Sequence, residues 1–405
     1  MMLCDDIDCT GCMSCVNICS HKALSIIADS EGFERPVVNK DLCTDCGACT
    51  NACPILNPVE LGDYNQKFYA SWTKDEKLRL ESSSGGLFTE LAKKILSQGG
   101  IVFGASFDDR FNVYHTYVET EEELSILRGS KYVQSSILHS FKDVKRFLKD
   151  GRYVLFSGTP CQIAGLRKYL IRSYDNLYTI DIICHGVPSP RVFNDYKEYV
   201  RNKIGSPLKS MKFRDKKYSW IFYNISINND EYIGTYYSDP FIRGFLRDYF
   251  LRPSCHNCRF TTLSRQGDIT IADYWGYRGV NKNDKNFKEL GVSLAIINSE
   301  KGDRLFNLSK SELVFYNKNQ NDALKTNASL TRSFPAPHLR MEFWKDYSAL
   351  PFETIVNKWM KPERIPVYRY IDSRFKHTIG IKGIIFITKS AWRAKHLLLK
   401  TLHIR

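Results

Sequence analysis

The chain has 405 residues, of which 43% are hydrophobic and 25% charged, and its formal net charge is +14. This length and composition suit folded cores and argue against an intrinsically disordered protein. The first six residues include two aspartates and lack the basic and apolar regions of a secretory signal, and no apolar run reaches the length of a membrane span. We therefore expect a cytoplasmic protein.

The charge is unevenly distributed along the chain. Residues 1–60 contain three basic and nine acidic side chains, so this segment is near −6 and the remainder near +20. A basic protein can bind nucleic acid, but no recognised nucleic-acid-binding motif accompanies the charge. We therefore expect no nucleic-acid partner.

The chain contains thirteen cysteines, and eight of them form two runs of the same spacing, Cys-x2-Cys-x2-Cys-x3-Cys. In a reducing cytoplasm, thiolates at short regular spacings more often bind metal than form disulfides. The two runs are Cys9, Cys12, Cys15, Cys19 and Cys43, Cys46, Cys49, Cys53. This repeat predicts a pair of iron-sulfur cluster loops related by a pseudo-twofold axis, each followed by a short helix.

Each run predicts one 4Fe-4S cluster, because the x2-x2 spacing wraps three thiolates around three irons and the fourth ligand comes from the other run. We assign the first cluster to Cys9, Cys12, Cys15 and Cys53. We assign the second cluster to Cys19, Cys43, Cys46 and Cys49. The alternative is a pair of zinc sites, but such sites use two pairs of ligands rather than interlocked quartets. The spacing therefore favours a bacterial-type ferredoxin head.

The segment after the head predicts a helix followed by a strand. Leu87, Leu91 and Ile95 recur at helical spacing within residues 87–96, directly after a serine-glycine turn. Two glycines end this helix, and the apolar residues 101–105 predict the strand.

A strand-helix-strand unit is predicted farther along the chain. Residues 152–156 predict the first strand, residues 161–170 the helix and residues 177–183 the second strand. This order predicts a right-handed parallel crossover. It would place Cys161 and Cys184 at the carboxyl ends of neighbouring strands, where α/β sheets carry their sites.

Four cysteines outside the head predict a third cluster, and only Cys4 is then left over. They are Cys161, Cys184, Cys255 and Cys258. Cys161 begins the predicted helix, where the helix dipole favours a thiolate. Buried structural cysteines or a zinc site are the alternatives. We expect His185 and His256 to be bystanders, because four cysteines already complete the ligand set.

Several motifs match, in order, those of a known family. They are Ser83–Gly86, Arg128–Ser135, Ser157–Gln162, Cys184–Ser189, Cys255-x2-Cys258 and Ala272–Gly276. From about Phe68 to Leu350 the sequence resembles the family of coenzyme F420 hydrogenase/dehydrogenase beta subunits, with the ferredoxin module fused in front. The resemblance implies FAD beside a 4Fe-4S cluster, and electron transfer between one-electron clusters and a two-electron organic partner.

The resemblance also points to residues that would contact FAD. The expected contacts are Ser83, Ser84, Gly85, Gly86, Lys131, Tyr132, Gln134 and Ser135. Glycines would let helix N-terminal amides reach a pyrophosphate, although a serine-glycine turn can equally be a helix cap. Lys131 is expected near the flavin ring or its phosphates, with a solvated surface lysine as the alternative. The basic cluster Lys212–Lys216 either holds an acidic substrate or faces water.

The C-terminal tail is strongly basic. From Arg374 onward it contains eight Lys and Arg residues and no acidic residue. If residues 389–403 are helical, the basic side chains form one stripe. Such a helix suits peripheral contact with an anionic membrane, docking of an acidic partner protein, or plain exposure to solvent.

We therefore predict an α+β protein, in which a small bacterial-type ferredoxin domain precedes a larger mixed α/β domain that binds flavin and an iron-sulfur cluster. The expected segments are the ferredoxin domain at 1–60, the family's N-terminal region at 61–150, its C-terminal region with the third cluster at 151–350, and the tail at 351–405. The predicted function is an oxidoreductase that passes electrons between 4Fe-4S clusters and FAD, and on to coenzyme F420 or another small organic acceptor. The alternative is a relay subunit that delivers electrons to a separate catalytic chain.

Overall fold

The computed structural model describes residues 3–217, 219–275, 277 and 290–362. The segment 389–403, which would present a basic stripe as a helix, lies outside the described residues. Among the described residues, no helix has the length and apolar content needed to cross a bilayer.

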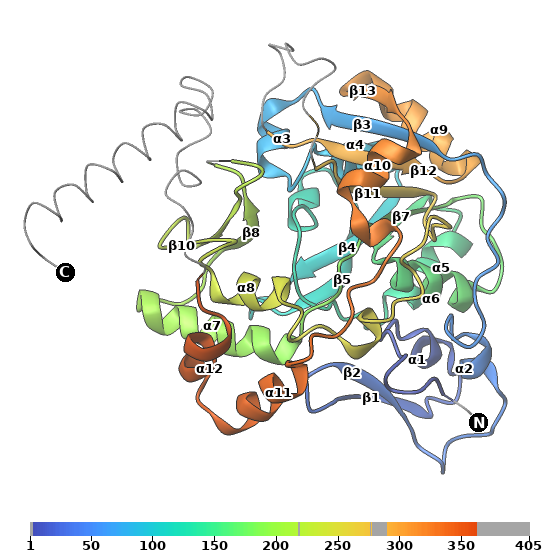
Figure 1. Cartoon of the computed structure of the whole chain (residues 1–405). Helices are drawn as coiled ribbons and strands as arrows, with labels where there is room; N and C mark the ends of the chain where they lie inside the picture. The colour runs from blue at the N-terminus through green and yellow to red at the C-terminus, as the bar shows by residue number, and fades with distance from the viewer. Residues whose placement is uncertain (1–2, 218, 276, 278–289, 363–405) are drawn as a thin grey trace, which may run out of the picture.

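An eight-stranded mixed sheet forms the centre of the larger part of the chain (Figure 1). Its strand order is β13-β3-β12-β11-β7-β6-β4-β5. The four neighbouring parallel strands are β4 (Ile101–Phe107), β6 (Val154–Gly158), β7 (Leu177–Ile182) and β11 (Ile269–Asp273). Antiparallel strands extend it on both sides: β3 (Lys67–Thr73), β5 (Val113–Val118), β12 (Ser293–Ile297) and β13 (Leu313–Lys318).

Helices cover both faces of this sheet, so the central strands are apolar on both sides. Helices α4 (Leu87–Leu96) and α9 (Glu300–Ser309) share one core with Leu155, whereas α5 (Ser140–Lys149) and α6 (Pro160–Leu170) share another with Val154 and Phe156. A strand buried on both faces reads as a continuous apolar run, which is the pattern in β6.

The predicted elements around the sheet are confirmed. Helix α4 has the expected bounds, β4 covers the predicted strand at 101–105, and α6 begins one residue before the predicted start. Strands β6 and β7 are parallel neighbours with Val154 opposite Leu177, so the predicted parallel crossover is present.

A second layer of structure lies beside the sheet, at the left of Figure 1. It contains a three-stranded antiparallel sheet of β8 (Met211–Asp215), β9 (Asn224–Ile227) and β10 (Tyr232–Thr235). Its helices are α7 (Pro190–Ile204), α8 (Pro240–Leu246), α11 (Arg340–Ala349) and α12 (Phe352–Trp359). Aromatic side chains, among them Phe193, Phe241 and Phe250, fill its core.

The remaining elements are short. They are α3 (Glu76–Glu81), η1 (Glu123–Ile126), η2 (Pro253–Cys255), η3 (Lys310–Glu312), α10 (Gln320–Thr326) and η4 (Ala328–Leu330). Of these, η2 matters most for the site, because it ends at one of the predicted ligands.

The head consists of α1 (Ser14–Ile18), the hairpin β1 (Leu24–Ala28) and β2 (Glu34–Val38), and α2 (Ala48–Asn51). We expected each short helix to follow its cysteine run, and this was wrong. Each helix begins inside its run, directly after a residue in the left-handed conformation, Met13 in one case and Gly47 in the other. The turn reverses the chain early, so the third cysteine of each run lies in the first turn of a helix.

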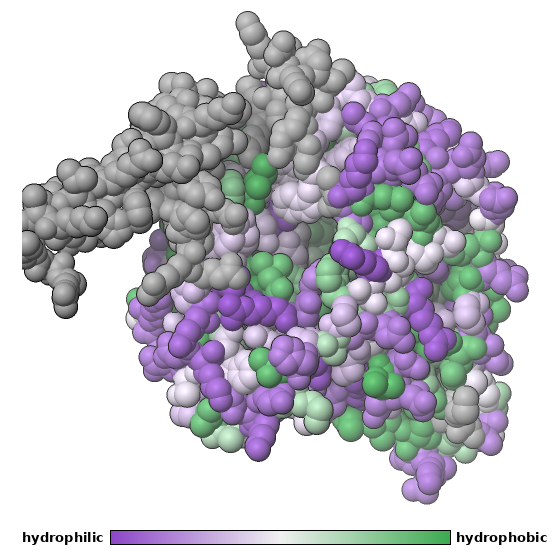
Figure 2. All heavy atoms as spheres, viewed as in Figure 1, coloured by the Kyte–Doolittle hydropathy of each residue, from purple (hydrophilic) through white to green (hydrophobic). Residues whose placement is uncertain are grey.

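The head packs against α5 and α6 of the larger part. The side chain of Met13 is buried in their core, and the amide of Asn17 donates to Leu138 O at 3.1 Å. Figure 2 shows apolar side chains at the lower right, where the head lies in Figure 1. Exposed apolar residues of the head include Ile7, Ile27, Val37 and Leu42.

Head and body approach each other closely at Gly165, in the middle of α6. A Cβ atom added there would lie 2.8 Å from Cys12 Cβ and 2.9 Å from its sulfur. Alanine normally stabilises a helix interior relative to glycine. At this position we expect Gly165→Ala instead to destabilise the protein by about 1–3 kcal/mol through overpacking, and to lower its iron content.

Anaerobic thermal unfolding and iron analysis would measure both effects. Gly62→Ala is the matched control, because no atom lies within 4 Å of the added Cβ there. A Gly165→Ala protein that keeps its iron and melts at a higher temperature would contradict the close contact.

Candidate functional site

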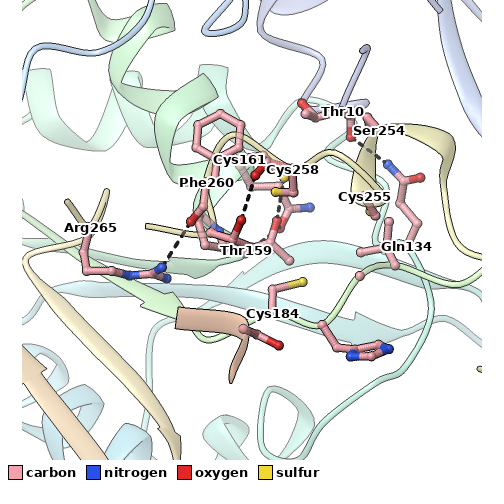
Figure 3. Close-up of a pocket in the computed structure, with 17 residues that line it drawn as sticks. Thr10, Gln134, Thr159, Cys161, Cys184, Ser254, Cys255, Cys258, Phe260 and Arg265 are labelled. Carbon is pink, nitrogen blue, oxygen red and sulfur yellow. Dashed lines mark hydrogen bonds between the residues drawn. The ribbon is translucent and has the colours of Figure 1, made fainter. Parts of the chain in front are cut away.

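The structure brings Cys161, Cys184, Cys255 and Cys258 together around one cavity (Figure 3). Cys161 lies in the first turn of α6, and Cys184 follows β7 on the adjacent parallel strand. Cys255 ends η2, and Cys258 lies in the turn after it. Their role as metal ligands stays a prediction. The two cysteines at the strand ends do lie beside the Cys255–Cys258 pair, as the sequence predicts.

A capping box fixes the position of Cys161. Gln162 Oε1 accepts a hydrogen bond from the Thr159 amide at 3.0 Å, and Pro160 occupies the first helical position. The hydroxyl of Thr159 lies 3.1 Å from the sulfur of Cys161. The start of α6 is therefore rigid, which holds this sulfur at the cavity wall.

Burial makes all four thiols of this cavity reluctant to ionise. The pKa of Cys161 is raised to about 11 and that of Cys255 to about 12, mainly by burial, with neighbouring thiols contributing. The pKa values of Cys184 and Cys258 are also raised, mainly by burial. A cationic group that replaces the protons would remove this penalty, and thiolate sulfur is the ligand that iron-sulfur clusters use.

The sulfurs surround space rather than meeting at one point. In the described part of the chain, no three cysteine, histidine or acidic side chains converge closely enough to hold a single metal ion. Four sulfurs around a cavity suit a multi-iron cube, whose irons lie apart from one another. No disulfide joins any of the thirteen cysteines.

A second cavity lies in the head. Its wall contains the quartet that the sequence assigns to the first cluster: Cys9, Cys12, Cys15 and Cys53. Two runs that are far apart in sequence therefore contribute to one site, as the interlocked pattern predicts. The same wall contains Cys4, whose pKa burial raises to about 12, with Cys53 adding to the effect. Cys4 belongs to neither run, so the spacing leaves it unassigned.

The second quartet of the head is less enclosed. Cys49 is buried, and burial raises its pKa, with the nearby Cys19 contributing. The sulfur of Cys19 accepts a hydrogen bond from the Ala23 amide at 3.4 Å. Cys43 is partly exposed and Cys46 is exposed. A cluster shared by these four residues stays a prediction.

The turn Ser83–Gly86 is occupied by contacts within the protein. The hydroxyl of Ser83 accepts a hydrogen bond from the Ser130 amide at 2.7 Å, and the Gly85 amide donates to Ser293 Oγ at 3.0 Å. A Cβ at Gly85 would lie 2.4 Å from Ser71 O, so packing against β3 requires this glycine.

The helix that follows this turn keeps two unused donors. The backbone amides of Leu87 and Phe88, in the first turn of α4, have no partner in the described part of the chain. Gly86 precedes them in the left-handed conformation and provides no side-chain cap. Amides of this kind are the usual donors to an anion at a helix start, so the turn fits a phosphate through these amides rather than through its glycines.

Lys131 and Tyr132 lie close to this turn. Lys131 Nζ donates to the carbonyls of Ile126, Arg128 and Gly129 at 3.0–3.3 Å. Burial lowers the pKa of Lys131 to about 7, and the three carbonyl oxygens oppose that change by favouring the ammonium form. Lys131 is thus an internally bonded lysine of intermediate exposure, and its place near a flavin stays a prediction.

Arg214 connects the turn to Tyr132, a role that the sequence did not indicate. Its guanidinium donates to Tyr132 Oη and to Ser83 O, each at 3.3 Å, and forms a bidentate ion pair with Asp273 at 2.8 and 3.1 Å. Trp220 Nε1 also donates to Asp273, at 2.7 Å. Within Lys212–Lys216, the interpretation that the cluster faces water was wrong for Arg214 and Lys216, which are buried.

Gln134 and Ser135 lie at the other end of the same segment. Gln134 lines the cavity of the third cysteine set, and its amide donates to Thr10 O of the head at 3.3 Å. Ser135 Oγ contacts His115 Nδ1 at 2.5 Å. The predicted flavin contacts therefore divide into a group near the turn and a group beside the cysteines, joined by residues 130–135.

The two histidines that we expected to be bystanders have different surroundings. His185 lines the cavity, and its Nε2 lies 2.6 Å from Asp248 Oδ1. His256 Nδ1 lies 3.1 Å from Phe334 O, and burial lowers the pKa of this residue. Both rings thus have partners of their own outside the cysteine set.

Comparison with known proteins identifies the family. Residues 151–322 match the family described as the C terminus of the coenzyme F420 hydrogenase/dehydrogenase beta subunit, and residues 68–142 match its N-terminal counterpart. The chain belongs to the family of coenzyme F420 hydrogenase/dehydrogenase beta subunits. Residues 8–56 match a 4Fe-4S dicluster domain, which confirms the predicted two-cluster head.

Three proteins illustrate the similarity. The chain is 27% identical over 186 residues to coenzyme F420-dependent sulfite reductase of Methanocaldococcus jannaschii, a match that covers 44% of this chain and only 28% of that protein. It is 22% identical over 326 residues to one of the subunits of F(420)H(2) dehydrogenase of Methanosarcina mazei, covering 75% and 83% of the two chains. A chain of the F420-reducing [NiFe] hydrogenase complex of Methanosarcina barkeri is similar with a TM-score of 0.45, 17% identity, and coverage of 76% and 98%.

His115 allows a test of how this site responds to pH. Burial lowers the pKa of His115 to about 4, and Nε2 donates to Ser157 O at 3.0 Å in the neutral form. Below pH 6.5 the unfolded chain binds the proton more readily than the folded chain, so stability falls as the pH drops toward 4. The full loss over this window is roughly 3 kcal/mol.

We expect His115→Gln, which keeps a donor toward Ser157, to flatten this dependence in anaerobic thermal unfolding between pH 7.5 and 5. The control is His139→Gln, because His139 is exposed. If the stability of His115→Gln depends on pH as steeply as that of the unchanged protein, His115 is not the titrating group.

Proposed function

We propose that this chain is an iron-sulfur flavoprotein that transfers electrons between three 4Fe-4S clusters and FAD, and thereby reduces or oxidises coenzyme F420 or another small organic molecule. The observation that carries this proposal is the contact between the two cysteine cavities. Thr10 lines both of them, and Cys12 of the head lies against the helix whose first turn holds Cys161. Clusters held there would be neighbours, as electron transfer between them requires.

The protein's own residues support a flavin beside the third cysteine set. The Leu87 and Phe88 amides offer donors for a phosphate group, and Lys131 offers a cation nearby. Tyr132 stacks on Phe245 with ring centroids 5.2 Å apart, and His185 also contacts Phe245, at 5.2 Å between centroids. This series of rings runs from the turn to the cavity wall. When bound, FAD would exchange electrons singly with clusters and in pairs with an organic substrate.

The identity of the substrate rests on the relatives. Two of them are named for coenzyme F420, which supports this coenzyme or a chemically similar acceptor. The chain spans little more than a quarter of the sulfite reductase, so sulfite reduction is not part of the proposal.

A second candidate function is that of an electron-relay subunit. It is favoured by the similarity to a protein named as a dehydrogenase subunit, which matches most of this chain. Redox partner proteins would then accept the electrons, and the exposed apolar residues of the head offer one surface for docking. Steady turnover of a soluble acceptor by the purified chain alone separates the two functions, because a pure relay would show none.

Iron analysis tests the three-cluster arrangement. We expect about twelve irons per chain after anaerobic purification, and about eight in Cys184→Ser, because only the third cluster loses a ligand. Acid-labile sulfide should fall in parallel. Cys4→Ser is the control, since Cys4 belongs to none of the three assigned quartets, and it should keep all the iron. Equal iron in Cys184→Ser and the unchanged protein would remove the third cluster from the proposal.

Flavin extraction tests the enzyme hypothesis. We expect about one FAD per chain, and at least a tenfold weaker retention in Lys131→Met, because the substitution removes a cation close to the proposed phosphate site. Lys142→Met is the control, since Lys142 is exposed on α5. Iron content should be equal in all three proteins. A chain purified with its iron but without any flavin would defeat the enzyme hypothesis and leave the relay.

A further inference from the structure

Arg252 is a fully buried cation at the junction between the head and the body. Its side chain is 0% exposed, and it lies between the bridge at Leu251 and the start of η2, three residues before Cys255. The backbone amide of Arg252 donates to Val187 O at 3.0 Å, which ties it to the loop that follows Cys184. The residue thus belongs to the frame of the third cysteine set.

The guanidinium of Arg252 points into the head. Nε donates to Cys9 O at 2.7 Å, and Nη2 donates to Glu34 O at 3.0 Å and to the sulfur of Cys9 at 3.6 Å. Nη1 donates to Gln134 Oε1 at 2.8 Å, and Gln134 in turn contacts Thr10 O. A Cβ at Gly11 would lie 2.5 Å from Nη1, so the cluster loop closes directly over the guanidinium.

The charge of Arg252 has no carboxylate partner in the described part of the chain, which is unusual for a buried arginine. Arg214 and Arg265, buried in the same body, pair with Asp273 and Asp181 at 2.8 and 3.2 Å. A buried charge is costly unless an opposite charge compensates it. The sulfur of Cys9 lies 3.6 Å from Nη2 and can supply negative charge on the head side, and Cys255 follows three residues later on the body side.

The electrostatic influence of Arg252 reaches both sides. On the head side Nη2 lies 3.6 Å from the sulfur of Cys9, and on the body side Arg252 is three residues before Cys255 and bonds to the loop that follows Cys184. A cube held by four thiolates carries net negative charge and becomes more negative on reduction, so two neighbouring cubes repel each other. A cation enclosed between them lowers that repulsion, and water is excluded from screening it.

We propose that Arg252 is a charge-compensating residue that raises the reduction potentials of the head cluster at Cys9 and of the third cluster, so that both can hold an electron while they are neighbours. This inference rests on the proposed function, because it requires clusters at both cysteine sets. Hydrogen bonds to cluster sulfurs and nearby charge are recognised controls of cluster potential.

Two variants reduce this positive charge in different ways. Arg252→Gln removes the charge, whereas Gln134→Glu places a carboxylate against Nη1 and leaves the guanidinium in place. We expect each variant to lower the midpoint potential of the cluster at Cys9. The equilibrium constant for its one-electron reduction should fall about tenfold, which corresponds to ~59 mV. The third cluster should shift in the same direction. The measurement is an EPR-monitored redox titration of the anaerobic full-length protein.

Arg259→Gln is the matched control. Arg259 also joins body to head, since Nη1 donates to Ile55 O at 3.2 Å, and it follows Cys258 directly. Its side chain is 55% exposed, so solvent screens its charge and the potentials should move much less. Iron analysis of all the variants shows whether each one has assembled its clusters.

If both Arg252→Gln and Gln134→Glu keep full iron and move the potentials no more than Arg259→Gln does, the inference is overturned. If Arg252→Gln assembles less iron, Gln134→Glu decides alone: a lowered potential supports the inference and an unchanged one overturns it. An unaltered protein without iron would overturn the proposed function as well. Full iron with unmoved potentials would overturn only the role of Arg252.

Discussion

The structure depends on one physical constraint. A cysteine thiol can bind iron only as the thiolate anion, yet these thiols are buried in surroundings that disfavour anions. Burial raises the pKa values of the four cysteines that line the cavity of the body. It also raises those of Cys12 and Cys15 in the head. The head matches a 4Fe-4S dicluster domain, so its folding is coupled to cluster assembly. The same coupling would hold for the body when its four cysteines bind the proposed third cluster.

This constraint explains how the head and the body are joined. The two cysteine cavities share Thr10, and the head packs on the helix whose first turn carries Cys161. Close packing at Gly165 and the enclosed guanidinium of Arg252 leave little room between the two sites. The ferredoxin-like head is therefore built into the body, so the proposed electron transfer between the two parts would need no separate docking step.

The region proposed for flavin is held in place differently, because its residues are bonded to ordinary elements of the sheet. The turn before α4 packs on β3 and on the residues that enter β12, and Arg214 with Asp273 connects it to the smaller sheet. Residues 130–135 run from this turn to the cysteine cavity. One short segment thus contacts both proposed redox sites.

The sequence by itself determined the two cysteine runs, the family, and the β6-α6-β7 crossover that sets Cys161 beside Cys184, because these depend on local spacing and periodicity. Only the tertiary structure decided that Gln134 lines the cavity of the third cysteine set, and that Cys4 shares the cavity of the first run. It also decided that Arg214 is paired with a carboxylate, whereas Arg252 has none within the described residues. The reason is that the partner of a buried charge comes from a distant part of the chain, so residue spacing does not predict which residue it is.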